Sequence, residues 1–183
     1  MKKYIAFNKP YGILSQFSGE DPAKTLATFN IPKDVYPVGR LDKDSEGLLI
    51  LSNDGKFINK LINPLSKKGK VYHVQVEGIP SIKALEAFRE GPLIKDHKCL
   101  PCQVKVLTDY IIEPRNPPIR ERKSIPTCWL EVVIFEGKNR QVRKMCAAIG
   151  NPCLRLLRVQ VGKFHLGDLK QGEWIEVRRD QIL

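Results

Sequence analysis

GRLDKDSEGLLIL, the stretch from residue 39 to residue 51, places a dense polar cluster directly before a short apolar run. The run from Leu48 to Leu51 predicts a buried strand. The polar part before it carries three carboxylates within five residues: Asp42, Asp44 and Glu46. Such a cluster suits acid–base chemistry, a metal site or a glycosidase-type pair, and it equally suits a solvated turn with capping acids. The residue types alone do not choose Asp42 over its two neighbours.

Outward from this cluster, hydrophobic periodicity predicts strands at 3–7, 71–77, 104–107, 128–135, 154–161 and 174–178. It predicts helices that carry Phe57 and end before Pro64, that span 81–89, and that run from Asn139 to Gly150. Strand 71–77 alternates in polarity and is expected to be half-buried. Strand 128–135 is apolar apart from Glu131 and is expected to be buried on both faces.

The predicted strands outnumber the helices and do not alternate regularly with them. This pattern favours an α+β fold with a largely antiparallel sheet over a doubly wound one. A chain of 183 residues suits a single domain, or one body with two lobes around a cleft. Helix 81–89 is expected to bury Ile82, Leu85 and Phe88 on one side.

The composition points to a polyanionic partner. Lysine and arginine number 31 against 20 acidic residues, which gives a net charge of +11. Each cation that meets a phosphate releases condensed counterions, so nucleic acid is the expected partner. The sequence has no basic amphipathic helix for a membrane surface, no apolar run long enough to span a bilayer, and no signal peptide at its start. A cytoplasmic location is therefore expected.

Metal and triad chemistry are weakly represented. The chain has three histidines and five cysteines, and none of the histidines lies near residues 39–47. His97, Cys99 and Cys102 have the spacing of half a zinc site, but a second pair of ligands is missing. We interpret the two cysteines as small residues beside a turn, and the odd number of thiols as typical of a reducing compartment.

Residues 111–127 predict a long irregular loop, because they include four prolines. Loops of this length in compact proteins tend to be functional. Its cations are Arg115, Arg120, Arg122 and Lys123, and we expect them to contact RNA phosphates. A solvated surface loop is the alternative.

The motif Gly39–Asp42, followed by Ser45–Leu49 and Asn53–Gly55, resembles the active-site motif of the RsuA-type pseudouridine synthases. Other stretches resemble that family's motifs in the same order along the chain. They are Asn8–Gly12, Lys70–Val74, Glu136–Met145 and Gly172–Trp174. The resemblance implies the pseudouridine synthase fold, with a mixed sheet, flanking helices and two lobes around a catalytic cleft. Many relatives carry an S4-type RNA-binding domain before the first motif, and here that motif begins at Asn8, so a single catalytic domain over residues 1–183 is expected.

The resemblance also assigns roles to residues. It implies that Asp42 is the nucleophile, that Arg143 keeps it ionised, and that Tyr72 stacks on the uracil. Arg40 would hold the backbone of the flipped nucleotide. The implied substrate is one uridine of 23S ribosomal RNA, in the free or partly assembled large subunit. Because the reaction only rearranges uridine, no cofactor is needed. The protein is also expected to be a monomer.

Two alternatives remain open at this stage. The charge and the loop would also suit a non-enzymatic protein that binds ribosomal RNA or assists ribosome assembly. The same reaction could also take place on another RNA.

Overall fold

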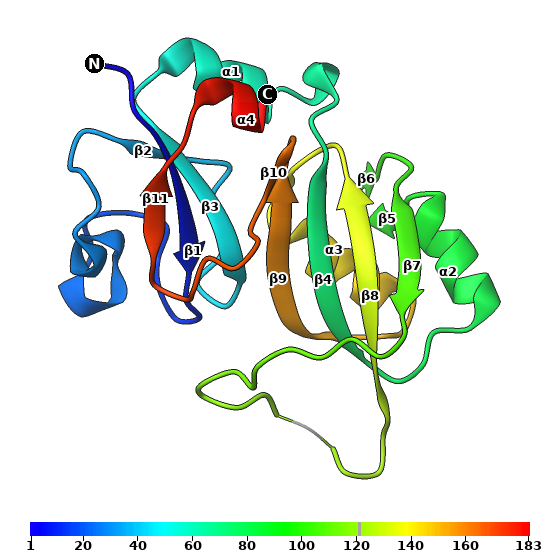
Figure 1. Ribbon diagram of the computed structural model, residues 1–183. Coiled ribbons are helices and arrows are strands. Elements are labelled where there is room, and N and C mark those ends of the chain that lie inside the picture. The colour runs from blue at the N-terminus through cyan, green and yellow to red at the C-terminus, as the bar shows by residue number, and fades with distance from the viewer. Residues whose placement is uncertain (121) are drawn as a thin grey trace. The chain divides into compact units, whose positions relative to one another are not determined.

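The computed structural model describes residues 1–120 and 122–183. The described chain divides into two compact units, which are coloured by residue number in Figure 1. Unit 1 comprises residues 1–70 and 157–183, and unit 2 comprises residues 71–156. The chain leaves unit 1 at the start of one strand and returns to it within another.

Unit 1 is built on a mixed sheet. Its strands are β1 (Tyr4–Lys9), β2 (Tyr36–Val38), β3 (Glu46–Ser52), β10 (Phe164–His165), β11 (Trp174–Glu176) and the second half of β9 (Cys153–Val161). Strand β3 pairs with β1 and β2 in antiparallel fashion and with β9 in parallel. Strand β11 pairs with the other edge of β1, and β10 forms a short hairpin with β9.

The central strand β3 is buried along its whole length, as the apolar run predicts. Leu48 and Ile50 join a core to which helices α1 (Gly55–Ile62) and α4 (Arg179–Ile182) contribute Phe57 and Ile182. Short 3-10 helices form at η1 (Pro22–Lys24), η2 (Leu26–Phe29) and η3 (Pro64–Ser66). Phe29 of η2 packs on Phe7, with ring centroids 5.0 Å apart.

Unit 2 combines β-strands with two helices. Its strands are β4 (Lys70–Glu77), β7 (Gln103–Leu107), β8 (Thr127–Ile134) and the first half of β9, with a separate hairpin of β5 (Leu93–Ile94) and β6 (His97–Lys98). Strand β8 lies between β4 and β7. Helices α2 (Ile82–Arg89) and α3 (Gln141–Ala148) complete the unit, with α3 behind β4 and β8 in Figure 1.

The structure corrects four of the predicted details. Strand β8 alternates between buried and half-buried side chains, so only one of its faces belongs to the core. Its other face is half-buried, and Glu131 on that face contacts His73 and Lys105. Ile82 is 78% exposed, because it occupies the first turn of α2 instead of its buried side.

The other two corrections concern the ends of elements. Strand β1 continues to Lys9, because Asn8 and Lys9 still pair with β3 where a turn was expected. Helix α3 begins at Gln141, because Arg140 has the left-handed φ of 52° that precedes the helix. Arg140 therefore precedes the helix that was expected to include it.

The α+β class and the largely antiparallel sheet are confirmed. The pairings of β1 with β3, β1 with β11, β2 with β3, β9 with β10 and β7 with β8 are antiparallel. No helix of the described residues is long and apolar enough to cross a membrane.

Two nearby glycines allow a test of the β3–β9 junction. A Cβ at Gly47, which has a φ of +96°, would lie 2.3 Å from the carbonyl oxygen of Arg158, whereas a Cβ at Gly55 meets nothing within 4 Å. We expect Gly47→Ala to lower the free energy of unfolding by about 1–3 kcal/mol, and Gly55→Ala to leave it unchanged or raise it by up to about 1 kcal/mol. Urea denaturation of both variants measures this, and equal stability of the two would contradict the close approach.

Candidate active site

The loop that carries Asp42 runs from the end of β2 to the start of β3. Hydrogen bonds to its backbone hold it in place. The buried Ser15 hydroxyl accepts a bond from the Leu41 amide at 3.1 Å and donates one to the Leu41 carbonyl at 2.7 Å. The Gly12 amide donates to the Lys43 carbonyl at 2.8 Å. The residues on either side of Asp42 are thus fixed to the segment that follows β1.

Within the loop, the Ser45 amide donates to the carbonyl of Asp42 at 3.1 Å. This bond closes a tight turn in which Lys43 and Asp44 occupy the tip. Asp42 itself is half-buried. A half-buried side chain on a backbone that is bonded on both sides is the arrangement that a positioned reactive group requires.

A buried arginine supports the two ends of this loop. Arg158 of β9 is only 2% exposed. Its Nε donates to the Leu48 carbonyl at 2.7 Å, and its Nη2 donates to the Gly39 carbonyl at 2.9 Å. One guanidinium therefore connects the residue before the loop to the strand after it.

The three carboxylates of the loop differ in their surroundings. Glu46 is fully buried in β3 and accepts a hydrogen bond from Gln171 Nε2 at 3.0 Å. Asp42 and Asp44 are each half-buried. The interpretation of the cluster as a solvated turn is therefore wrong for Glu46, whose side chain is part of the interior of unit 1.

A buried lysine completes the charge arrangement of the site. Lys9 is fully buried, and its ammonium donates to the carbonyls of Pro10 at 2.9 Å and Ile13 at 2.6 Å. Burial lowers its pKa from 10.5 to about 8, although the negative charges of Glu46, Asp44 and Asp42 oppose that shift.

Arg40 belongs to unit 1, together with Asp42. It is exposed, and its Nη2 donates to Gln16 Oε1 at 2.9 Å. Tyr72 and Arg143 belong to unit 2. Tyr72 is 8% exposed on β4, and Arg143 is half-buried on α3, where its Nη1 lies 3.5 Å from both the carbonyl oxygen and the Sγ of Cys153.

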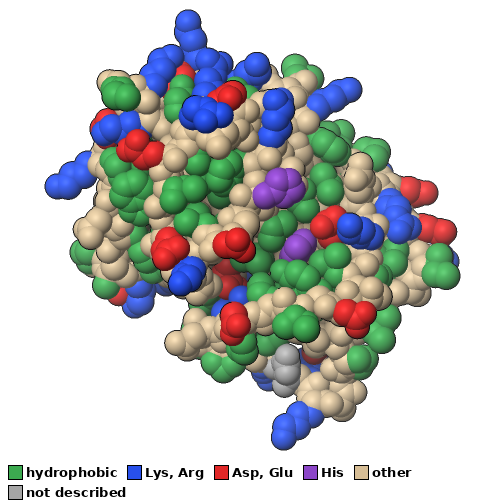
Figure 2. Space-filling model, viewed as in Figure 1, with side chains coloured by type: hydrophobic (Ala, Val, Ile, Leu, Met, Phe, Trp, Pro, Cys, Tyr) green, Lys and Arg blue, Asp and Glu red, His purple; other side chains and the backbone are tan. Residues whose placement is uncertain are grey.

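The described residues of the segment 108–126 contain no helix or strand, as the prolines predict. Arg115 donates to the carbonyls of Pro117 at 2.8 Å and Pro118 at 3.2 Å. Arg122 Nε lies 3.6 Å from Glu77 Oε1. Arg120 and Lys123 are exposed. Figure 2 shows that lysine and arginine side chains are spread over the visible face of the molecule and are not confined to this loop.

The sequence analysis did not identify Ser15, Arg158 or the role of Lys9. Arg158 left a signal, because it is a charged residue between Leu157 and Val159 in the predicted strand 154–161. A charge in a buried strand is rarely tolerated without a partner. Ser15 left no such signal, since a serine in an irregular segment is common.

Known proteins match most of this chain. The family model for RNA pseudouridylate synthase matches residues 3–148. A protein of Vibrio parahaemolyticus named ribosomal large subunit pseudouridine synthase E is 52% identical over 97% of this chain and 74% of its own length. A protein of the same name from Xanthomonas axonopodis is 50% identical over 90% of this chain and 88% of its own length.

A solved structure also matches the whole chain. It is described as a pseudouridylate synthase, with a TM-score of 0.80 at 25% identity, and the match covers 100% of this chain and 73% of the other. This likeness extends the agreement from the motifs to the arrangement of strands and helices.

The shifted pKa of Lys9 predicts a pH dependence of stability. The unfolded chain keeps the lysine proton up to a pKa near 10.5, whereas the folded protein releases it near a pKa of about 8. Between these values the unfolded state binds more protons, so the stability contributed by Lys9 rises with pH and is lost as the pH falls through 8. We expect the free energy of unfolding of the unaltered protein to gain roughly 1–2 kcal/mol relative to Lys9→Met between about pH 7.5 and 9.5. Urea denaturation at several pH values measures this difference, and a difference that does not change with pH would contradict it.

Proposed function

The chain belongs to the RNA pseudouridylate synthase family and is a pseudouridine synthase, and we propose that it converts one uridine of 23S ribosomal RNA to pseudouridine with Asp42 as the nucleophile. Support for the substrate comes from the relatives, which are named ribosomal large subunit pseudouridine synthases. The observation that carries the proposal is the loop itself: a half-buried aspartate on a backbone fixed by Ser15 and Arg158.

The reaction explains why a carboxylate is sufficient. The N1–C1′ bond of uridine breaks, the detached ring turns, and C5 bonds to C1′. The proton on C5 is lost and N1 gains one, so nothing is oxidised and no group enters or leaves. The protein must supply a nucleophile, a place to hold the ring, and a route for that proton. None of these needs a cofactor.

We assign the remaining roles within this proposal. Tyr72 stacks on the uracil, and Arg40 holds the backbone of the extruded nucleotide. A carboxylate in a desolvated site is pushed toward its neutral form, and a guanidinium opposes that tendency. Arg143 supplies it, and the half-burial of Arg143 in unit 2 supports a role beyond that of a solvated helix residue.

The irregular loop contributes phosphate contacts. Arg120 and Lys123 are the strongest candidates, because they are exposed. Arg115 and Arg122 would contact RNA less freely, since each is already engaged with protein oxygens. The enzyme acts as a monomer in the cytoplasm. Its substrate there is the ribosomal RNA of free or partly assembled large subunits. The same reaction on a different RNA is the alternative, which the charge and loop would also support.

Release of tritium from RNA labelled at uridine C5 tests the nucleophile and the substrate together. In buffer with EDTA and no added nucleotide, we expect release from a 23S transcript and none from a 16S transcript. Asp42→Asn keeps the shape of the side chain but removes the nucleophile, so turnover should fall by at least about 10⁴-fold while RNA affinity persists. Asp44→Asn is the matched control and should stay active.

The opposite result, with Asp44→Asn inactive and Asp42→Asn active, would show that the nucleophile is misassigned. The same assay tests Arg143. Arg143→Met should cripple turnover, because the variant lacks the guanidinium that the proposal assigns to the site. Arg143→Lys should retain more activity than Arg143→Met, although a point charge replaces the planar fork poorly.

Salt dependence of RNA binding tests the loop. If Arg120 and Lys123 each neutralise a phosphate, replacing both with Gln should flatten the slope of log K against log salt by about 1.4–1.8 in total. Replacing Lys56 and Lys60 with Gln removes the same charge from exposed positions on α1 and serves as the matched control. Equal changes in both double variants would mean that net charge, and not the loop, sets the affinity.

A further inference from the structure

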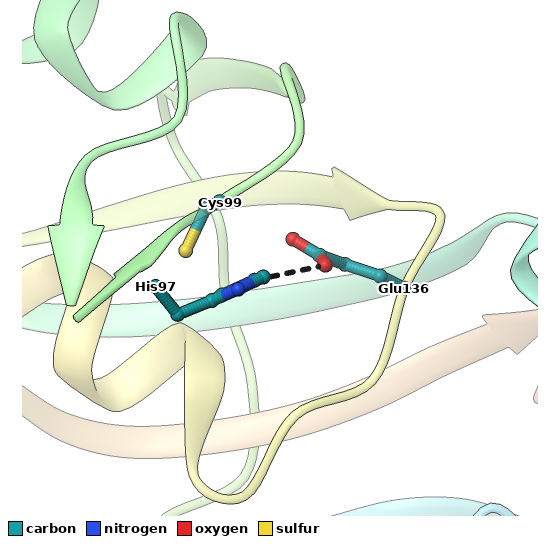
Figure 3. A group of neighbouring side chains, drawn as sticks. All are labelled: His97, Cys99 and Glu136. Atoms are coloured by element: carbon teal, nitrogen blue, oxygen red, sulfur yellow. Dashed lines mark hydrogen bonds and ion pairs between the residues drawn. The ribbon is translucent and has the colours of Figure 1, made fainter. Parts of the chain in front are cut away.

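Three side chains with metal-ligating atoms converge in unit 2 (Figure 3). His97 belongs to β6, Cys99 follows that strand directly, and Glu136 follows β8. One ligand atom from each lies within 4.8 Å of the other two. His97 Nε2 lies 3.3 Å from Glu136 Oε2.

These separations fit a tetrahedral zinc ion. Zinc binds nitrogen and oxygen at about 2.0–2.2 Å and sulfur at about 2.3 Å. At tetrahedral angles, the nitrogen and oxygen ligands are then about 3.3–3.6 Å apart, and the sulfur is about 3.5–3.7 Å from each of them. The distance between His97 and Glu136 already has this value, and the sulfur, which lies within 4.8 Å of both, needs a shift of about 1 Å, which a small rotation about its Cα–Cβ bond can supply.

The carboxylate is oriented before any ion arrives. Glu136 is buried, and its Oε1 accepts hydrogen bonds from the Leu100 amide at 2.8 Å and from Gln141 Nε2 at 2.6 Å. These bonds direct Oε2 toward His97. Outer partners of this kind fix the orientation of metal ligands and are a regular part of metal sites.

The cysteine is equally fixed. Its amide donates to the Pro92 carbonyl at 3.2 Å, and Gly91 allows the close approach, because a Cβ at Gly91 would lie 2.2 Å from the Cys99 carbonyl oxygen. Cys102, which sequence spacing pairs with Cys99, is used elsewhere. Its buried thiol donates to the Phe88 carbonyl at 3.2 Å.

Charge and access also suit a divalent cation. A thiolate and a carboxylate together balance a charge of +2, which removes the cost of burying Glu136 as a lone anion. His97 is the exposed member, at 43%, and it borders a cavity of 370 Å³ that Ile94, Lys138 and Gln141 also line. The cavity gives an ion a route inward and leaves room for a water molecule as the fourth ligand.

We propose that His97, Cys99 and Glu136 form a zinc site with a water as the fourth ligand. Thiolate and imidazole together select zinc over magnesium or calcium, which prefer oxygen ligands. The ion would join the β5–β6 hairpin to the segment that leads into α3, the helix that carries Arg143. Its function is to stabilise unit 2, and it takes no part in the isomerisation. It is therefore independent of the proposed reaction, for which the tritium-release test above uses buffer with chelator.

Metal analysis of the full chain, purified with reductant and without a histidine tag, tests the site. We expect about one zinc per chain, which raises the melting temperature when it is restored after chelation. Cobalt loaded in place of zinc should give the near-ultraviolet thiolate-to-cobalt band and the visible bands of a tetrahedral ion. This test uses the unaltered chain. If the thiolate-to-cobalt band is absent at saturating cobalt, the proposal is overturned.

Two variants identify the ligand. Cys99→Ala should abolish the thiolate band and weaken zinc binding more than about 100-fold, as measured against a chromophoric chelator. Cys128→Ala, which removes another buried thiol of unit 2, is the matched control and should change neither. A thiolate band that survives in Cys99→Ala but disappears in Cys102→Ala would also overturn the ligand set. Loss of activity in chelator would contradict the metal-free reaction and would leave the evidence for binding intact.

Discussion

The buried guanidinium of Arg158 is the interaction on which unit 1 depends. It is taken out of water in β9 and is compensated by the carbonyls of Gly39 and Leu48, the residues that flank the Asp42 loop. Removing a charge from water costs several kcal/mol unless such partners are present. The loop, the central strand and the parallel neighbour of that strand must therefore form together. Gly47 belongs to the same constraint, because only a residue without Cβ fits against the Arg158 backbone.

This constraint divides one acidic cluster into parts with different tasks. Glu46 lies inside unit 1, where Gln171 binds it, and it contributes to the field that keeps Lys9 charged. Asp42, only four residues earlier, stays half-buried on a backbone that Ser15 fixes. Supporting groups that are locked by packing keep a reactive side chain in position at low entropic cost. The chemistry assigned to Asp42 thus relies on charges that never meet the substrate.

Unit 2 shows a different solution to the burial of polar groups. One face of its sheet is apolar, while on the other Glu131 pairs with Lys105 and shares a hydrogen bond with His73. Glu136 lies at the end of β8 and receives hydrogen bonds from two separate segments, the one after β6 and the start of α3. A single carboxylate thereby ties a hairpin to a helix. A bound cation at that carboxylate would strengthen a connection that already exists.

The sequence by itself determined the fold class, the apolar strand at 48–51 and the motif that contains Asp42, because hydrophobic periodicity and short-range spacing are local properties. It also determined the end of α1 before Pro64, because proline has no backbone N–H and its ring prevents the α-helix from continuing. Tertiary structure alone decided which face of β8 is buried and that Ile82 is exposed, since both depend on the neighbours that each residue meets. It alone brought Arg158 to Gly39, 119 residues away in the chain. It likewise brought Glu136, and not Cys102, to His97 and Cys99, because a ligand set is defined by distances in space that spacing along the chain does not contain.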